Sequence, residues 1–229
     1  MSAIVLFAGA GVLAMALAAV GSAVSQSRAA AAAMEASWRA PGAAGSIRTT
    51  MMLGLVFLEA LALFVFAVVF VLAGRVTPES GAFAVGAVLA MAIAAIGSAV
   101  SQSRAAAAAM EASWRAPGAA GSIRTTMMLG LVFMEALTLF VFAIVFVLAG
   151  RVTPESGPFA AGAVLAMAIA AIGSALAQGG TAASALKATW KRPEEAGSAR
   201  TSMMLALVFM EALTLFVFAI VFVLAGRVG

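Results

Sequence analysis

Three glutamates lie inside long apolar stretches of this 229-residue chain. They are Glu59, Glu135 and Glu211, and each directly follows the sequence Leu-Val-Phe-Leu or Leu-Val-Phe-Met. A carboxylate at such a depth in a bilayer costs several kcal/mol unless it is protonated, neutralised or coordinated. It would hold a proton readily and release it only where water or a cation reaches it. One such residue at the same place in three segments predicts an ion carrier, in preference to a buried Glu that only hydrogen-bonds a neighbouring helix.

A second polar position accompanies each of these carboxyls. Gln26, Gln102 and Gln178 lie in the apolar stretch that precedes each glutamate-bearing stretch. A glutamine carbonyl accepts a hydrogen bond from a protonated carboxyl, and its amide donates to an ionised one. The alternative is a polar residue that faces only the helix end or the loop. Because three Gln match three Glu, we predict that each Gln is the ion-site partner of one Glu.

The composition excludes several classes of active site. Cys, His and Asp are absent, which excludes disulfides, thiolate or histidine-ligated metal sites and a Ser-His-Asp triad. We therefore expect no catalytic residue, no metal and no cofactor other than a bound ion. The net charge of +4 could suggest nucleic acid. However, the basic residues are spread among short loops, and an excess of Lys and Arg is typical of the cytoplasmic loops of membrane proteins. We therefore expect no nucleic-acid partner.

An internal repeat determines the predicted architecture. Residues 21–57 return unchanged at residues 97–133, a shift of 76 residues, and a diverged third copy follows 76 residues later. We predict three units, 1–76, 77–152 and 153–229, each a hairpin of two apolar helices. Because about 20 apolar residues cross a bilayer, the chain is expected to be an all-α membrane protein with six transmembrane helices.

The first unit shows the expected limits of the helices. Its first helix should run to about Trp38. The loop at 40–46 contains a Pro and a Gly that end this helix. The second helix is expected from Ile47 to about Leu72. The opening stretch lacks the basic start of a signal peptide and its equivalents recur inside the chain, so we interpret it as a retained transmembrane helix.

Charge indicates the orientation of the hairpins. Each within-hairpin segment holds three or four Lys or Arg, whereas each linker between hairpins holds one, Arg75 or Arg151. The hairpin loops are therefore expected on the cytoplasmic or equivalent side, and both termini on the opposite side.

Small residues in the first helix of each unit predict close helix packing and self-association. A helix with small residues beside a bulky, Phe-rich helix forms a wedge, and wedges close into rings. If every hairpin joins a homo-oligomeric ring, the number of hairpins is a multiple of three, such as nine, twelve or fifteen, and we favour four chains. The residues, spaced by two and four, are Gly21, Ala23, Ser25 and Ser27, matched by Gly173, Ala175, Ala177 and Gly179.

These residues resemble the c subunit, or proteolipid, of rotary F-type ATP synthases, here in a tandem triple-hairpin form. The family pattern is a small-residue helix, a loop with Arg-x-Pro, an Arg at the start of the second helix and a carboxylate eleven residues after that Arg. Arg48 and Glu59 have this spacing, and it recurs in both later units. The segment 209–214, Phe-Met-Glu-Ala-Leu-Thr, resembles the plastid and cyanobacterial branch. The matching loop residues are Arg39, Pro41, Arg115, Pro117, Lys191 and Pro193.

The resemblance implies a function. A ring of hairpins would rotate against a stator a subunit whose Arg displaces the bound ion, while the loops contact the central stalk. Proton translocation on the glutamates would be coupled to rotation and ATP synthesis, with this chain as a non-catalytic rotor subunit. The expected location is a bacterial inner membrane or an energy-transducing organelle membrane, in contact with lipid.

The residue after each carboxyl predicts the ion. A sodium site needs several oxygen ligands to replace the hydration shell. Sodium-type members of the family commonly place Ser or Thr directly after the carboxylate, whereas this chain has Ala60, Ala136 and Ala212. We therefore expect H⁺, with Na⁺ the weaker alternative. Arg28 and Arg104 depart from the family pattern, and we expect them to snorkel to the interface.

Two other functions fit part of the sequence. Proteolipids of vacuolar or archaeal-type rotary ATPases usually have several hairpins per chain, although the motif of the second helix argues against them. A structural or engineered membrane assembly that adopts the ring fold without turnover is the other alternative, because the first two repeats are nearly identical. Carbodiimide reactivity of the glutamates, with loss of ATP-driven pumping, would separate the carrier from this assembly.

Overall fold

The computed structural model describes residues 2–228, with side chains as far as residue 226. Six long helices make up this part of the chain, and it contains no strand. Every helix is long and apolar enough to cross a membrane. The predicted all-α fold of three tandem transmembrane hairpins is confirmed. The helices are α1 (Ala3–Arg39), α2 (Ala44–Ala73), α3 (Gly81–Arg115), α4 (Ala120–Ala149), α5 (Gly157–Lys191) and α6 (Ala196–Val228).

Each hairpin turns through a short 3₁₀ helix that begins at a proline. In the first hairpin, Ala40 leaves the helical region with φ −135° and ψ 75°, because a following proline disfavours the α conformation. The second helix then begins at Ala44, earlier than the predicted start at Ile47. Alanine has the highest helix propensity, so the helix starts directly after the proline turn. The three turns are Pro41–Ala43, Pro117–Ala119 and Pro193–Glu195.

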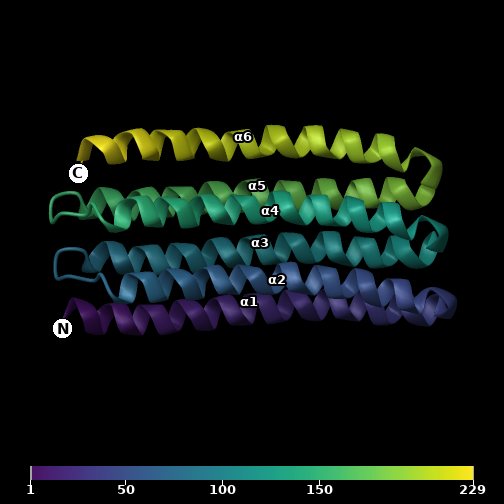
Figure 1. Cartoon of the computed structure of the whole chain (residues 1–229), viewed down its shortest axis with the longest axis horizontal. Helices are drawn as coiled ribbons and strands as arrows, with labels where there is room; N and C mark the ends of the chain where they lie inside the picture. Colours follow the sequence, from purple (N-terminus) through teal and green to yellow (C-terminus); the bar gives the residue numbers. More distant parts are fainter. Residues whose placement is uncertain (1, 229) are drawn as a thin grey trace.

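The helices form two layers. In the inner layer α3 packs between α1 and α5. In the outer layer α2 lies against α1 and α3, α4 lies against α3 and α5, and α6 packs on α5 and α4. The three hairpin turns lie at one end of the molecule, and the two linkers and both termini lie at the other (Figure 1). Each hairpin therefore stands beside the next in the same orientation.

The structure divides the predicted small-residue set of α1 between two sides of the helix. Gly21 faces α3 so closely that a Cβ atom on it would lie 2.7 Å from Cγ1 of Ile96. Ser25, one turn further on, is buried, whereas Ala23 and Ser27 are exposed. Residues two positions apart point to nearly opposite sides of a helix. Gly21 and Ser25, four positions apart, therefore pack inside the chain, whereas Ala23 and Ser27 point away from it.

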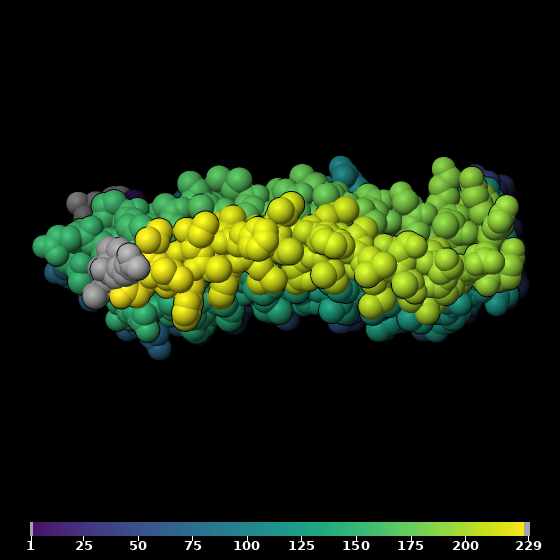
Figure 2. Space-filling model, turned by 90° about the horizontal axis from the view of Figure 1, so that it is seen from above, coloured from purple at the N-terminus to yellow at the C-terminus, as the bar shows by residue number. Residues whose placement is uncertain are grey.

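The chain has two open edges, one formed by α1 and α2 and the other by α5 and α6. Figure 2 looks onto the second edge, where α6 runs along the whole length of the molecule. The central helix α3 is the most buried of the six and α6 the least buried. Large apolar side chains are exposed on α6, among them Phe209, Leu213 and Phe216. Such an edge is suited to contact with lipid or with another membrane protein.

Candidate functional site

The three glutamates lie on the outer helices, and two of them, Glu135 and Glu211, lie at seams between neighbouring hairpins. Glu135 and Phe142 are seven residues apart, so they share one face of α4. The Phe142 ring lies 6.0 Å from the ring of Phe64 in α2, which places this face toward the preceding hairpin. Glu135 and Glu211 are partly buried, whereas Glu59, which has no preceding hairpin in the chain, is exposed. The surroundings of Glu135 and Glu211 are therefore completed by the hairpin before each of them.

A serine of each inner helix anchors the backbone beside the glutamate. Its hydroxyl donates to the carbonyl of the residue directly before the Glu. These serines are not among the residues predicted from the sequence, although each occurs four residues before a Gln, one turn away on the same helix face. The bonds are Ser22 to Leu58 at 2.8 Å, Ser98 to Met134 at 2.9 Å and Ser174 to Met210 at 3.0 Å.

Two of the three predicted glutamine partners reach the same stretch of the outer helix. The amide of Gln102 donates to the carbonyl of Leu131 at 3.4 Å, and that of Gln178 to the carbonyl of Leu207 at 3.3 Å. These carbonyls lie one turn before the glutamates. Both Gln side chains are fully buried, and their Oε1 atoms have no hydrogen-bond partner among the described residues. The amide of Gln26 instead donates to a neighbouring serine hydroxyl at 3.3 Å. A direct bond between Gln and Glu stays a prediction.

The residue three positions after each glutamate makes the three sites unequal. The Thr214 hydroxyl lies 2.7 Å from the Ser174 hydroxyl. Thr138 is equally buried, but its hydroxyl has no partner in the described part of the chain. The first repeat has Ala62 at this position. The polar surroundings of the carboxyl therefore differ between repeats, although the serine contact is present in all three.

Removing one of these serine hydroxyls should weaken a hairpin without changing its carboxyl. Ser98→Ala removes one interhelical hydrogen bond, and such bonds average about 0.6 kcal/mol in membrane proteins. We expect the triple Ser22, Ser98 and Ser174 variant to lose about 2 kcal/mol by additivity, measured by titration with SDS in mixed micelles. Ser103→Ala is the matched control, because this buried hydroxyl bonds only within α3, to Val100 at 2.8 Å. An equal loss in Ser98→Ala and Ser103→Ala would contradict the anchoring role.

Cation–π contacts join the loop ends of neighbouring hairpins. The Arg39 guanidinium lies 5.0 Å from the ring centroid of Trp114, and that of Arg115 lies 4.5 Å from Trp190. Lys191 lies 5.8 Å from Trp190 of its own hairpin. The predicted loop residues thus gather at one end of the molecule, while their contact with a stalk stays a prediction. The exposed turn residues of the same predicted set are Pro41, Pro117 and Pro193.

In hairpins two and three, the Arg at the start of the second helix reaches back to the preceding hairpin. Arg124 donates to the Ser46 hydroxyl at 3.3 Å, and Arg200 donates to the Thr126 hydroxyl at 3.3 Å. Arg48, the equivalent residue of the first repeat, is exposed. As for the glutamates, a residue of hairpin two contacts hairpin one, and the equivalent residue of hairpin three contacts hairpin two.

Three stretches of the chain match the model of one protein family, that of the ATP synthase C subunit. They are residues 9–72, 85–148 and 161–224, which together cover well over half of the chain. The chain belongs to the ATP synthase C subunit family. Each match contains one of the three glutamates, which confirms the predicted tandem triple-repeat form of this family.

Individual members of the ATP synthase C subunit family are about as long as one hairpin of this chain. The ATP synthase c subunit of Carboxydothermus hydrogenoformans is 38% identical over 74 residues, which are 32% of this chain and 90% of the relative. The chloroplastic ATP synthase c subunit of Emiliania huxleyi is 48% identical over 61 residues, 27% of this chain and 74% of the relative. The ATP synthase c subunit of a Synechococcus strain is 45% identical over 62 residues, 27% and 76% of the two chains.

Membership of the family makes the chain an integral membrane protein and a rotor proteolipid. Members of the family normally form a ring within the ATP synthase complex. Nothing in these comparisons favours the alternative of a vacuolar or archaeal-type proteolipid.

Proposed function

We propose that this chain assembles into a homo-oligomeric ring and carries one proton on each of Glu59, Glu135 and Glu211. Proton binding and release would couple translocation to rotation and thereby to ATP synthesis, with the chain as a non-catalytic rotor subunit. One observation carries the proposal. Every hairpin has a carboxyl at the same position of its outer helix, without an ion pair to any residue that the structure describes, and in hairpins two and three this carboxyl lies on a seam with the preceding hairpin. Such a carboxyl is stable in the apolar region when protonated.

The buried glutamine oxygens support proton binding at this place. Gln102 and Gln178 each present an acceptor that is buried and unpaired within the described residues. An unsatisfied buried acceptor is costly, and a protonated carboxyl is a hydrogen-bond donor that would satisfy it. The amides of both Gln contact the outer helix one turn before the Glu, so donor and acceptor belong to the same stretch of the hairpin.

The edges of the inner layer support a ring. Inside the chain, a Cβ atom on Gly97 would lie 2.7 Å from Cγ1 of Ile172 on the next inner helix. By the 76-residue repeat, the same contact between two copies would join Gly173 of one to Val20 of the next. Gly173 has open space around it, and Val20 is 62% exposed. The two edges of one chain are thus complementary to each other, which is the head-to-tail interface that generates rings.

The outer layer and the loops support the same arrangement. The ring contact of Phe64 with Phe142 would recur between Phe216 of one copy and Phe66 of the next, both of which are exposed. Trp38 is the equivalent of Trp114 and Trp190 in the first hairpin. It has no preceding hairpin to contact within the chain and is 81% exposed. A neighbouring copy would also supply the preceding hairpin that Glu59 lacks. The first ion site is then completed only on assembly.

We propose H⁺ as the ion, because the position directly after each carboxyl supplies no oxygen ligand for a sodium ion. The three serine hydroxyls donate to backbone carbonyls, and the position after each carboxyl is alanine. We further propose that the hairpin loops face the cytoplasm or its equivalent and contact the central stalk. The stator a subunit would face the glutamate seams from the membrane side.

The test is carbodiimide labelling of the ring in the complete ATP synthase, reconstituted in vesicles. Dicyclohexylcarbodiimide is an apolar reagent that reacts with protonated carboxyls, so it should label the three glutamates and stop ATP-driven acidification of the vesicles. Sodium should give no protection from labelling at neutral pH. Protection by sodium would overturn the assignment of H⁺, while labelling without any loss of pumping would overturn the carrier role itself.

A further inference from the structure

Arg104 marks a boundary on the exposed face of α3. Ile93 and Arg104 are eleven residues apart, and Arg104 and Glu111 seven, so the three share one face of the helix. All three are exposed, on the side of α3 that α2 and α4 leave uncovered. The face is apolar on the linker side of Arg104 and charged on the loop side, where Arg115 follows. An amphiphile lying along this face would place its polar head beside Arg104.

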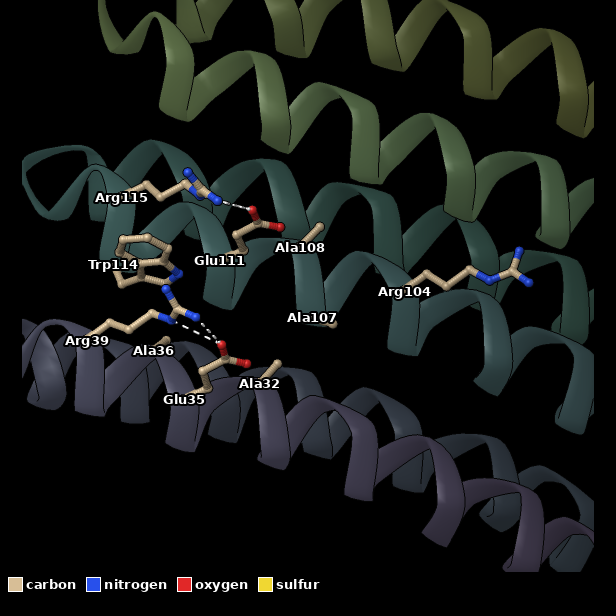
Figure 3. A pocket seen from close by; sticks show the side chains of 10 residues that line it. All are labelled: Ala32, Glu35, Ala36, Arg39, Arg104, Ala107, Ala108, Glu111, Trp114 and Arg115. Carbon is tan, nitrogen blue, oxygen red and sulfur yellow. Dashed lines mark hydrogen bonds and ion pairs between the residues drawn. The ribbon is translucent and has the colours of Figure 1, made fainter.

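A cleft of about 560 Å³ lies between α1 and α3 on the loop side of this boundary. Its charges are two ion pairs and one further cation. Arg39 pairs with Glu35 at 2.6 Å, and Arg115 pairs with Glu111 at 2.9 Å. The Arg104 side chain extends away from both pairs (Figure 3), and it forms no ion pair or hydrogen bond with any residue that the structure describes. The cleft therefore has one positive charge in excess.

An arginine beside an apolar span places its charged head at the membrane interface, where a counter-charge stabilises it. The chain supplies none here, because both nearby glutamates are engaged with their own arginines. The anion that a membrane itself offers at this level is a lipid phosphate, and a planar guanidinium binds a phosphate through two parallel hydrogen bonds. The single excess charge matches one phosphodiester whose headgroup carries no cation of its own.

We propose that the cleft between α1 and α3 binds the headgroup of an anionic glycerophospholipid, with Arg104 as the phosphate ligand. The acyl chains lie along the apolar face that contains Ile93. Because the cleft is formed within one chain, this site does not depend on the function proposed above. Arg28 is the equivalent residue on α1 and is exposed in the same way. In the proposed ring it would line a second cleft against α5 of a neighbouring copy, where Lys187 takes the place of Glu35.

The third repeat lacks this site. Gly180 occupies the position of Arg28 and Arg104. The smaller cleft between α3 and α5, about 220 Å³, is lined by Glu111 and Lys187, whose charges are opposite. A Cβ atom on Gly180 would meet nothing within 4 Å, so a side chain can be added here without steric conflict.

Lipid retention by the purified full-length assembly tests the proposal. The protein is equilibrated in mixed micelles with equal amounts of phosphatidylglycerol and phosphatidylcholine of the same chain length, washed, and its bound lipid is quantified by mass spectrometry. The wild type should retain phosphatidylglycerol preferentially. In the double variant Arg28→Gln and Arg104→Gln this preference should fall about fivefold per site, the factor for one basic side chain at an anionic membrane surface. The variant Gly180→Arg should retain additional phosphatidylglycerol.

The control is the double variant Arg75→Gln and Arg151→Gln, which removes the same charge from the exposed linkers at the other end of the molecule. It should leave the lipid preference unchanged. An equal loss in both double variants would show that only net charge matters and would overturn the site. A wild type without preference, or a Gly180→Arg variant without additional lipid, would overturn it as well.

Discussion

Replacing Glu59, Glu135 and Glu211 together by glutamine is expected to reduce coupled proton transport to the background rate while the assembly stays intact. Glutamine keeps the size and hydrogen-bonding capacity of a protonated carboxyl but cannot release a proton. A neutral side chain also removes the cost of a charge in the apolar region, so stability should not fall. The measurement is ATP-driven acidification of vesicles that contain the complete synthase, together with the mass of the extracted assembly.

The matched control changes three carboxyls that lie at the ends of the molecule. Glu79, Glu155 and Glu194 are exposed in the linkers and the third loop, and their replacement by glutamine removes the same number of carboxyls. Transport should be retained in this control. Full transport by the variant of the three membrane glutamates would show that the protons take another path.

Gly173→Leu is expected to prevent ring closure and leave the single chain folded. A Cβ atom on Gly173 would meet no atom within 4 Å, so α5 of the isolated chain accommodates the larger side chain. In an assembly it would meet Val20 of the next copy, where the equivalent glycine inside the chain leaves no room. Overpacking of this kind costs about 1–3 kcal/mol at each contact, and a ring contains one such contact per chain. The assembly should dissociate into single chains or open oligomers, observed by native mass spectrometry.

Two further variants isolate the cause. Gly180→Leu adds the same side chain to α5 at a position that is also open. The equivalent residue of the middle hairpin, Arg104, is exposed although the next inner helix lies beside it, so this variant should leave the ring intact. Adding Val20→Gly to Gly173→Leu restores space on the opposing edge and should recover assembly in part. Loss of assembly in Gly180→Leu, or an intact ring in Gly173→Leu, would contradict the proposed edge contact.

The mass of the wild-type ring tests the same assembly independently. Because one chain contributes three hairpins, the mass should be a whole multiple of 22.8 kDa and the hairpin count a multiple of three. Four chains remain our favoured size, since the Ala and Ser of the inner helices are bulkier than the glycine series of the family pattern. A hairpin count not divisible by three would show that some hairpins lie outside the ring.

The sequence by itself determined the parts of this protein that depend on composition and local chain chemistry. Apolar length predicts the six spans, the repeat predicts three equivalent hairpins, and proline in each loop predicts where the first helix ends. The depth of Glu59, Glu135 and Glu211 follows from their positions within the apolar stretches, because a helix advances by a constant rise per residue. The family was recognisable for this reason, since its pattern is a set of spacings along two helices.

Only the tertiary structure decided which groups meet across those helices. The serine beside each glutamate bonds a backbone carbonyl, and every residue has a carbonyl, so no side chain in the sequence marks the acceptor. The contact of Arg39 with Trp114 depends on how one hairpin lies beside the next, which periodicity does not specify. The division of the small residues of α1 also required the structure, because the spacing shows two sides of a helix and only packing shows which side is covered. Glu59 is exposed and Glu135 is partly buried for the same physical reason: nearly identical local sequences differ in burial when one of them lacks the neighbouring hairpin that completes its seam.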